Sequence, residues 1–281
     1  MTLPPLPPTS LGMIDAIARI ADALDRIAPP RVANADPAAA SAFVWDGQGL
    51  RAVRSFGPLP LDRLRGVDSQ KAALRANFDR LARGVAAQDV LLWGARGTGK
   101  SALVKAAIGD LQASAAPIAL VEVVTDRLDT LPHLFTLLAG APRAFAVFLD
   151  DLGFAAAGEA RALRSLLEGG AEARPANTRL VVTSNRRHLI PRDIAEQDGA
   201  INQRDSIDDQ LALADRFGLS LGFHALDQDG YLAIVRGYCD AAGLGFDSAD
   251  AVQWATRRGS RSGRVAWQYV VEVAGRAGKA L

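Results

Sequence analysis

The stretch Gly94-Ala95-Arg96-Gly97-Thr98-Gly99-Lys100-Ser101 is the most informative part of this sequence. It matches the phosphate-binding loop pattern in full, and it lies directly between the apolar residues 90–93 and a predicted helix. Glycines here allow backbone N–H groups to turn toward phosphate oxygens, and a helix that begins at the loop directs its positive end at the anion. The stretch therefore predicts an α/β fold with a nucleotide-binding loop rather than a chance glycine-rich turn.

The side chains of this loop predict which groups of a nucleotide they would meet. Lys100 is expected to reach the terminal phosphates of ATP, and the Ser101 hydroxyl is expected to ligate Mg²⁺. The other predicted ATP contacts in the loop and at the start of the helix are Gly94, Ala95, Arg96, Gly97, Thr98, Gly99 and Ala102.

Two aspartates directly follow the apolar residues 145–149. Because ligands bind at the carboxyl ends of parallel strands, both are expected in the nucleotide site. Asp150 is the predicted Mg²⁺ ligand. Asp151 is the candidate for polarising the attacking water, but it is one methylene shorter than glutamate, so a capping or loop role stays open as the alternative.

A third apolar stretch, 180–183, ends in the small polar residues Ser184 and Asn185. An amide at this point can hold the attacking water and the γ-phosphate without adding charge, which makes Asn185 a catalytic candidate. Asn is also common where strands end in turns, so simple strand termination is the alternative.

Apolar and helical stretches alternate from Leu61 onward, which predicts a mostly parallel sheet covered by helices on both faces. The five predicted strands are 90–93, 118–124, 145–149, 180–183 and 219–223. The helices predicted between them are 68–83, 100–113, 128–139 and 159–168, and three more follow at 227–240, 247–258 and 262–277. This pattern predicts an accessory region (1–60), an α/β nucleotide-binding domain (61–224) and a small all-helical lid (225–281).

The accessory region contains one predicted helix and one short apolar segment. Ser10 is a candidate cap for a helix that ends at the prolines 29 and 30, with most apolar side chains on one face: Leu11, Ile14, Ile17, Leu24 and Ile27. Core packing and partner docking are the two alternatives for this face. The helix and residues 43–45 are the candidate adaptor surface.

The composition excludes several classes of protein. Among 281 residues, 32 basic and 31 acidic side chains give a formal net charge of +1, which does not mark a general nucleic-acid or membrane-surface binder. With 49% hydrophobic residues, no membrane-length apolar stretch and no secretory signal pattern, the chain is expected to be globular and cytoplasmic. Cys239 stands alone and the three histidines are scattered, so neither a disulfide nor a metal cluster is predicted.

The order of these motifs resembles that of an AAA+ ATPase. More narrowly, residues 61–277 resemble a bacterial AAA+ family of unknown function. The segments that carry the resemblance are LLWGARGTGKS (91–101), FLDDL (148–152), TSNRRHLIPRD (183–193), LADRFGLSLGF (213–223) and SGRVAWQ (262–268).

The resemblance implies three further roles. Arg216 corresponds to the arginine finger, which in this superfamily reaches the γ-phosphate of a neighbouring subunit and so implies a homo-oligomer. Arg264 corresponds to the second sensor, which contacts nucleotide from the lid of the same chain. Val67, after Gly66, matches the place where such proteins enclose the adenine.

Simpler roles remain open for both arginines. Arg216 is one of 28 arginines and could lie on a solvated surface. Arg264 has neighbours of the same kind in Arg257, Arg258 and Arg261, and this basic cluster could instead contact nucleic acid.

These observations support three hypotheses for function, with ATP and Mg²⁺ as the expected cofactors in the first two. The first is an ATPase that remodels or loads an unidentified protein or nucleic-acid partner. The second is a slow or non-hydrolysing ATP-dependent switch that holds such a partner. The third, a small-molecule kinase, needs an acceptor pocket, and Asn185 together with Arg264 argues against it.

Overall fold

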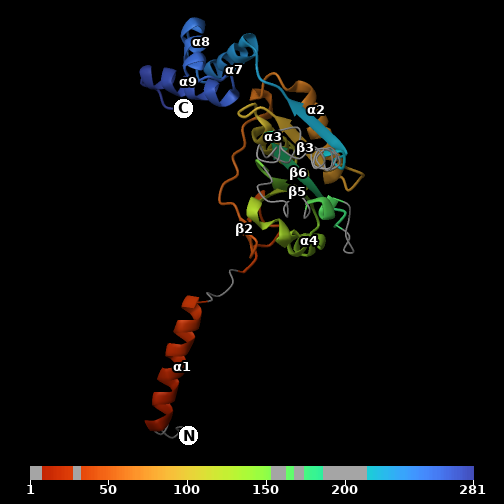
Figure 1. Cartoon of the computed structure of the whole chain (residues 1–281), viewed down its shortest axis with the longest axis vertical. Helices are drawn as coiled ribbons and strands as arrows, with labels where there is room; N and C mark the ends of the chain where they lie inside the picture. The colour runs from red at the N-terminus through yellow and green to blue at the C-terminus, as the bar shows by residue number, and fades with distance from the viewer. Residues whose placement is uncertain (1–7, 28–32, 153–162, 168–173, 186–213) are drawn as a thin grey trace, which may run out of the picture. The chain divides into compact units, whose positions relative to one another are not determined.

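The structure is a computed structural model that describes residues 8–27, 33–152, 163–167, 174–185 and 214–281. It divides into two compact units, residues 1–34 and 35–281. The first unit contains α1 (Pro8–Ile27), which begins two residues before Ser10, so the predicted cap at Ser10 was wrong. The second unit contains a sheet with its flanking helices and a group of three further helices (Figure 1).

One sheet of seven strands forms the centre of the second unit. Its order is β2-β1-β4-β5-β6-β3-β7, and every neighbouring pair is parallel except β1 with β2. The strands are β1 (Ala42–Trp45), β2 (Leu50–Ala52), β3 (Val90–Gly94), β4 (Ile118–Val123), β5 (Ala144–Leu149), β6 (Thr178–Ser184) and β7 (Leu219–Phe223). The parallel α/β architecture confirms the predicted fold class.

The predicted number of five strands was wrong, because residues 42–52 of the predicted accessory region form a hairpin that extends the sheet. Phe43 and Trp45 of β1 are buried in the core, so they are not an adaptor surface. Asp46 closes the turn by accepting bonds from the backbone N–H groups of Gln48 and Gly49, each at 3.0 Å. Strands of three or four residues give too short an alternation to be recognised from sequence.

Helices cover both faces of this sheet, as Figure 1 shows. On one face α2 (Asp68–Ala82) and α3 (Lys100–Ala113) pack against side chains such as Leu92 and Phe148. On the other face α4 (Leu131–Ala139), which follows the 3-10 segment η2 (Thr125–Thr130), packs against Leu91 and Val147. Residues 163–167 are helical, and the rest of the predicted helix 159–168 lies outside the described residues.

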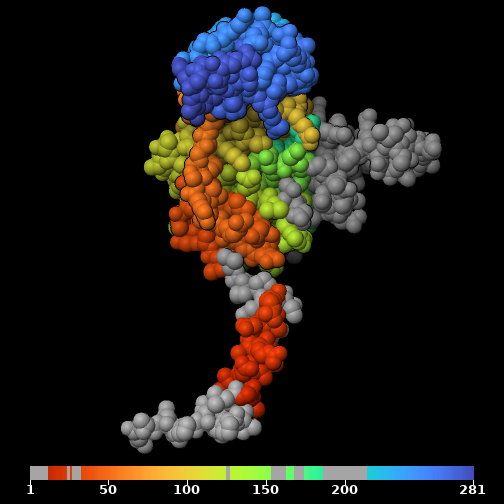
Figure 2. Space-filling view, turned by 90° about the vertical axis from the view of Figure 1, so that its left-hand side faces the viewer, coloured from red at the N-terminus to blue at the C-terminus, as the bar shows by residue number. Residues whose placement is uncertain are grey.

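Three helices form the predicted lid: α7 (Gln228–Ala241), α8 (Ser248–Arg257) and α9 (Gly263–Arg276). Each begins with a side-chain cap, from Asp227, Asp247 and Ser262 in turn. The helices enclose their own core around Tyr231 and Tyr269, and the space-filling view shows them as one continuous mass at the C-terminal end of the chain (Figure 2). Cys239 is buried in this core. Among the described helices, none is both long and apolar enough to span a membrane.

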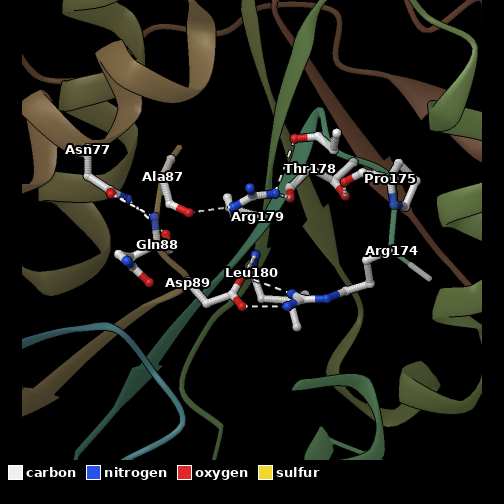
Figure 3. A network of polar contacts seen from close by, with 10 residues as sticks. Asn77, Ala87, Gln88, Asp89, Arg174, Pro175, Thr178, Arg179 and Leu180 are labelled. Carbon is white, nitrogen blue, oxygen red and sulfur yellow. Dashed lines mark hydrogen bonds and ion pairs between the residues drawn. The ribbon is translucent and has the colours of Figure 1, made fainter. Parts of the chain in front are cut away.

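A polar network joins β3 and β6 at their amino ends (Figure 3). Arg174 donates two bonds to the Asp89 carboxylate, at 2.8 and 2.6 Å, and the same carboxylate accepts the Leu180 N–H at 2.8 Å. Next to it, the Asn77 amide exchanges two 2.9 Å bonds with the backbone of Gln88. The Asp89 and Arg174 side chains are 10% and 20% exposed, so this ion pair is shielded from water.

Replacing Asp89 by alanine is expected to lower the free energy of unfolding by about 3 kcal/mol, because it leaves a shielded guanidinium and a buried N–H without their acceptor. Asp110→Ala is the matched control: it removes a 2.6 Å pair with Arg75, but these side chains are 37% and 43% exposed. That control is expected to cost less than about 1 kcal/mol. Urea unfolding of both variants measures the difference, and equal losses would contradict the burial argument.

Candidate nucleotide-binding site

The phosphate-binding loop is fixed to the sheet at its first glycine. Gly94 has φ +131°, and a Cβ at this position would lie 1.9 Å from the Phe223 carbonyl oxygen of β7. The next residue, Ala95, donates its N–H to the same oxygen at 3.1 Å. Only glycine fits here, because the two backbones approach each other too closely for a side chain.

Lys100 is the first residue of α3, and its side chain folds back into the loop. The Nζ group donates to the carbonyl oxygens of Gly94 and Ala95, both at 2.8 Å, and to Asn185 Oδ1 at 3.3 Å. Burial lowers the pKa of Lys100, and the nearby carboxylates of Asp151 and Asp150 oppose that shift. A phosphate anion beside this ammonium would stabilise its charged form.

Asp150 lies at the end of β5 and joins two hydroxyl groups from different elements. Its Oδ1 accepts from Ser101 Oγ and from Thr183 Oγ1, both at 2.6 Å. The structure thus brings together the two side chains predicted to hold Mg²⁺. Thr183, at the end of β6, was not predicted as a site residue. Its signal in the sequence is a hydroxyl near the end of an apolar stretch, and the structure shows that this residue is buried.

Asp151 takes the left-handed backbone conformation, with φ +52°. Its N–H donates to Thr183 Oγ1 at 2.8 Å, so β6 supports this conformation, which is unfavourable for a residue other than glycine. One carboxylate oxygen accepts from the Asn185 amide and the other lies 3.4 Å from the Arg96 guanidinium. The side chain is 57% exposed at the mouth of the site.

The lid contacts the phosphate-binding loop directly. Gly263, the first residue of α9, donates its N–H to the Gly97 carbonyl oxygen at 3.0 Å. A Cβ on Gly97 would lie 2.8 Å from Ser262 Oγ, so this glycine allows the lid to approach. Arg264 follows on the same first turn of α9, so the start of this helix lies beside the loop.

A cavity of about 590 Å³ lies between the loop, the ends of β5 and β6, and the lid. The predicted site residues that line it are Val67, Arg96, Gly97, Thr98, Gly99, Lys100, Ser101, Ala102, Asp150, Asp151, Asn185 and Arg264. Gly94 and Ala95 contribute through the carbonyl groups that hold Lys100. The lining residues that sequence reasoning missed include Leu64, Thr183, Tyr238 and Trp267.

Tyr238 and Trp267 place an aromatic pair in the lid wall of this cavity, with ring centroids 5.3 Å apart in an edge-to-face arrangement. They come from α7 and α9, which the fold brings together. Burial raises the pKa of Tyr238, so its hydroxyl stays protonated at neutral pH. Both rings can pack against an apolar or aromatic group such as a base.

Arg216 does not line this cavity. It lies just before β7, at the opposite end of the strand from Phe223, which contacts the loop. Its neighbour Phe217 is buried in the core, which fixes the position of this turn. Residues 186–193 of the segment TSNRRHLIPRD lie outside the described residues.

Arg258 of the basic cluster has partners within the lid, and so does Arg276 at the end of α9. Arg258 stacks over the Trp254 ring at 3.6 Å and donates to Gln268, while Arg276 pairs with Asp250 and Glu272. These contacts hold the lid together, and they leave Arg257 and Arg261 as exposed cationic side chains.

The donors of this cavity fit a magnesium-bound nucleoside triphosphate. Lys100 and the start of α3 suit phosphate, and the Ser101–Asp150 pair offers two oxygen ligands of the kind Mg²⁺ prefers. Within the described residues there is no cluster of three or more His, Cys, Asp or Glu side chains that could hold a metal alone. Mg²⁺ generally takes one or two ligands from protein carboxylates and the others from phosphate and water.

Comparison with known proteins identifies one matching family and several solved structures of similar fold. The family described as "Protein of unknown function (DUF815)" matches residues 38–277. No curated protein matches the chain. Among solved structures, the RuvB Holliday junction branch migration motor of Thermotoga maritima is similar, with a TM-score of 0.51 and 18% identity over 79% of this chain and 67% of that one. The Aeropyrum pernix ORC1 protein, solved in complex with DNA, has a TM-score of 0.53 and 16% identity over 76% of this chain and 61% of that one.

Proposed function

We propose that this chain, which belongs to the family described as "Protein of unknown function (DUF815)", is an AAA+ ATPase that hydrolyses ATP with Mg²⁺ at sites between subunits. The observation that carries the proposal is the contact set in which Ser101 and Thr183 both donate to Asp150 while Lys100 lies in the same cavity. This set supports the proposal because a cation suited to phosphate and oxygen atoms suited to a metal lie on one side of a cavity of nucleotide size.

Each of these residues would act on a different part of the reaction. Lys100 would hold the terminal phosphates, and Ser101 and Asp150 would hold Mg²⁺, which neutralises charge on the phosphates when bound. Asn185 and Asp151 would orient the water, and Asp151 would accept its proton as the oxygen attacks the γ-phosphorus and the bond to the leaving ADP oxygen breaks.

In this proposal the site also uses one residue from a second copy of the chain. Arg216 lies just before β7, at the end of that strand remote from the loop, which supports a role at a neighbouring subunit's nucleotide rather than at its own. An added guanidinium stabilises the charge that develops on the transferring phosphate. The proposed assembly is therefore a homo-oligomer with Arg216 of one copy beside the cavity of the next.

The work done by this assembly is proposed to be the remodelling or loading of a macromolecule, either protein or nucleic acid. RuvB is described as a branch migration motor, and the ORC1 protein was solved with DNA. The contact from Gly263 to Gly97 gives the lid a direct connection to the phosphate loop, through which phosphate release can move the lid.

A second candidate function is a switch that binds ATP and hydrolyses it slowly or not at all. Asp151 favours this candidate: it is short, and its two carboxylate oxygens already face Asn185 and Arg96. A carboxylate held in this way is a weaker base for water.

ATP turnover per subunit, measured over increasing protein concentration with and without Mg²⁺, tests the first proposal. We expect Mg²⁺-dependent turnover whose rate per subunit rises with concentration, because sites between subunits form only on association. Turnover that is negligible at every concentration, together with tight ATP binding, would favour the switch. Absence of ATP binding would contradict both.

A further inference from the structure

The geometry points to α1 as a self-association helix that packs against α1 of a second copy of this chain. The proposal does not depend on ATP hydrolysis. Its starting observation is a row of large apolar side chains that α1 leaves in solvent: Met13, Ile14, Ile17 and Ile20 are between 53% and 65% exposed. In proteins most of a helix's stability comes from packing its apolar face, so an exposed face of this kind indicates a helix that packs against a partner.

The apolar residues follow the spacing of a coiled coil. Large apolar residues occur at Met13, Ile17, Ile20, Leu24 and Ile27, in alternating steps of four and three. These are the a and d positions of a seven-residue repeat, with Met13, Ile20 and Ile27 at d and Ile17 and Leu24 at a. A strict 3.5-residue period is the pattern of a helix that packs along another helix of the same period.

The rest of α1 fits the same repeat. The a and d residues together form one apolar stripe, called here the seam. The e and g positions between 13 and 27 are Ile14, Ala16, Ala21 and Ala23, which widen the seam and allow close approach of a second helix. Every charged residue of α1 falls at b, c or f, on the opposite side: Asp15, Arg19, Asp22, Asp25 and Arg26. A helix with apolar a, d, e and g positions is complementary to itself.

Two other possible partners for the apolar face of α1, a membrane surface and residues 35–281 of the chain, fit it less well. A membrane surface attracts helices with an excess of Lys and Arg, whereas α1 carries three aspartates and two arginines. The body of the chain, in the described part of 35–281, exposes few large apolar side chains, and they are scattered: Val85, Val124, Trp267, Val271 and Leu281. Trp267 and Val271 lie one turn apart on α9, and Trp267 lines the nucleotide cavity.

Sedimentation velocity of the full chain without nucleotide tests the inference with two matched variants. Ile17→Asp puts a charge into the seam, and an unpaired buried carboxylate is expected to weaken association about 100-fold or more. Ala18→Asp adds the same charge one residue away, at the exposed b position, and is expected to leave association within about 3-fold of wild type. Ile17→Leu keeps the seam apolar and is expected to retain association.

Thiol cross-linking gives a second readout that does not depend on whether Ile17→Asp folds. The only native cysteine, Cys239, is buried, so an introduced cysteine is the reactive one. Ile20 lies at the d position in the middle of the seam: in a parallel pair it meets its own equivalent, and in an antiparallel pair it meets Ile17 of the second copy, about one helical turn from its own equivalent. A short cross-linker is expected to join copies of the Ile20→Cys variant and not of Asp22→Cys, whose position faces outward.

A wild-type chain that stays monomeric without nucleotide and gives no cross-link through Ile20→Cys overturns the inference. So does an association that Ala18→Asp weakens as much as Ile17→Asp. Arg216→Ala separates this inference from the proposed ATPase: it is expected to leave nucleotide-free association through α1 intact, even if intersubunit hydrolysis is lost or was never present.

Discussion

Replacing Lys100 by alanine is expected to weaken ATP binding about 100-fold, since a charged hydrogen bond to phosphate contributes roughly 1.5–3 kcal/mol and no other lysine lines the cavity. Burial lowers the pKa of Lys100 because it makes the charged ammonium less favourable. An anion bound beside the ammonium stabilises its charge and offsets this cost of burial. Turnover should fall at least as far as binding, because the same charge would stabilise the transferring phosphate. Calorimetric titration with ATP and Mg²⁺ measures the affinity.

Lys105→Ala is the matched control for this experiment. Lys105 lies on the same helix, α3, but pairs with Glu122 at 2.8 Å near the surface, away from the cavity. Its loss is expected to leave the ATP dissociation constant within about 2-fold of wild type. If Lys100→Ala binds ATP as tightly as Lys105→Ala, the cavity is not a nucleotide site. Melting curves of both variants show whether the carbonyl groups of Gly94 and Ala95, left without their donor, also loosen the loop.

The sequence predicted well those features that depend on local pattern. The phosphate-binding loop, the aspartates after β5 and the amide after β6 each follow an apolar strand, and parallel strands bring their carboxyl ends to one edge. The structure accordingly places Lys100, Ser101, Asp150, Asp151 and Asn185 around one cavity. The lid helices were also predicted closely, because polar caps such as Asp227 and Asp247 mark where they begin.

Features that depend on contacts between distant segments were not predicted. The hairpin of β1 and β2 joins the sheet through pairing with β4, about 75 residues later in the chain, and its strands are too short to show a period. Thr183 joins the site by donating a hydrogen bond to Asp150 at the end of a different strand. The Tyr238–Trp267 pair forms only when α7 and α9 pack together. The contact from Gly263 to Gly97 is a hydrogen bond between two backbone groups. The pattern of side chains in a sequence does not predict such a bond.

Arg216→Ala is expected to lower the rate of ATP turnover about 1,000-fold or more while leaving ATP affinity within about 3-fold of wild type, because an arginine finger acts on the transition state rather than on binding. Arg83→Ala removes an exposed arginine that pairs with Asp79 on α2, and it is expected to leave the rate unchanged. Arg216 is half-buried before β7, so thermal melting of the variant must accompany the kinetics. A parallel loss of stability and affinity would indicate a structural role instead.

Mixing two inactive variants tests whether Arg216 acts between subunits. In a mixture of Arg216→Ala with Lys100→Ala, a cavity with an intact Lys100 can lie beside a subunit with an intact Arg216, so part of the lost turnover is expected to return. The recovered rate should rise with total protein concentration, since it depends on mixed association. If both residues acted within one chain, every subunit in the mixture would lack one of them, and no ratio of the two variants would restore activity.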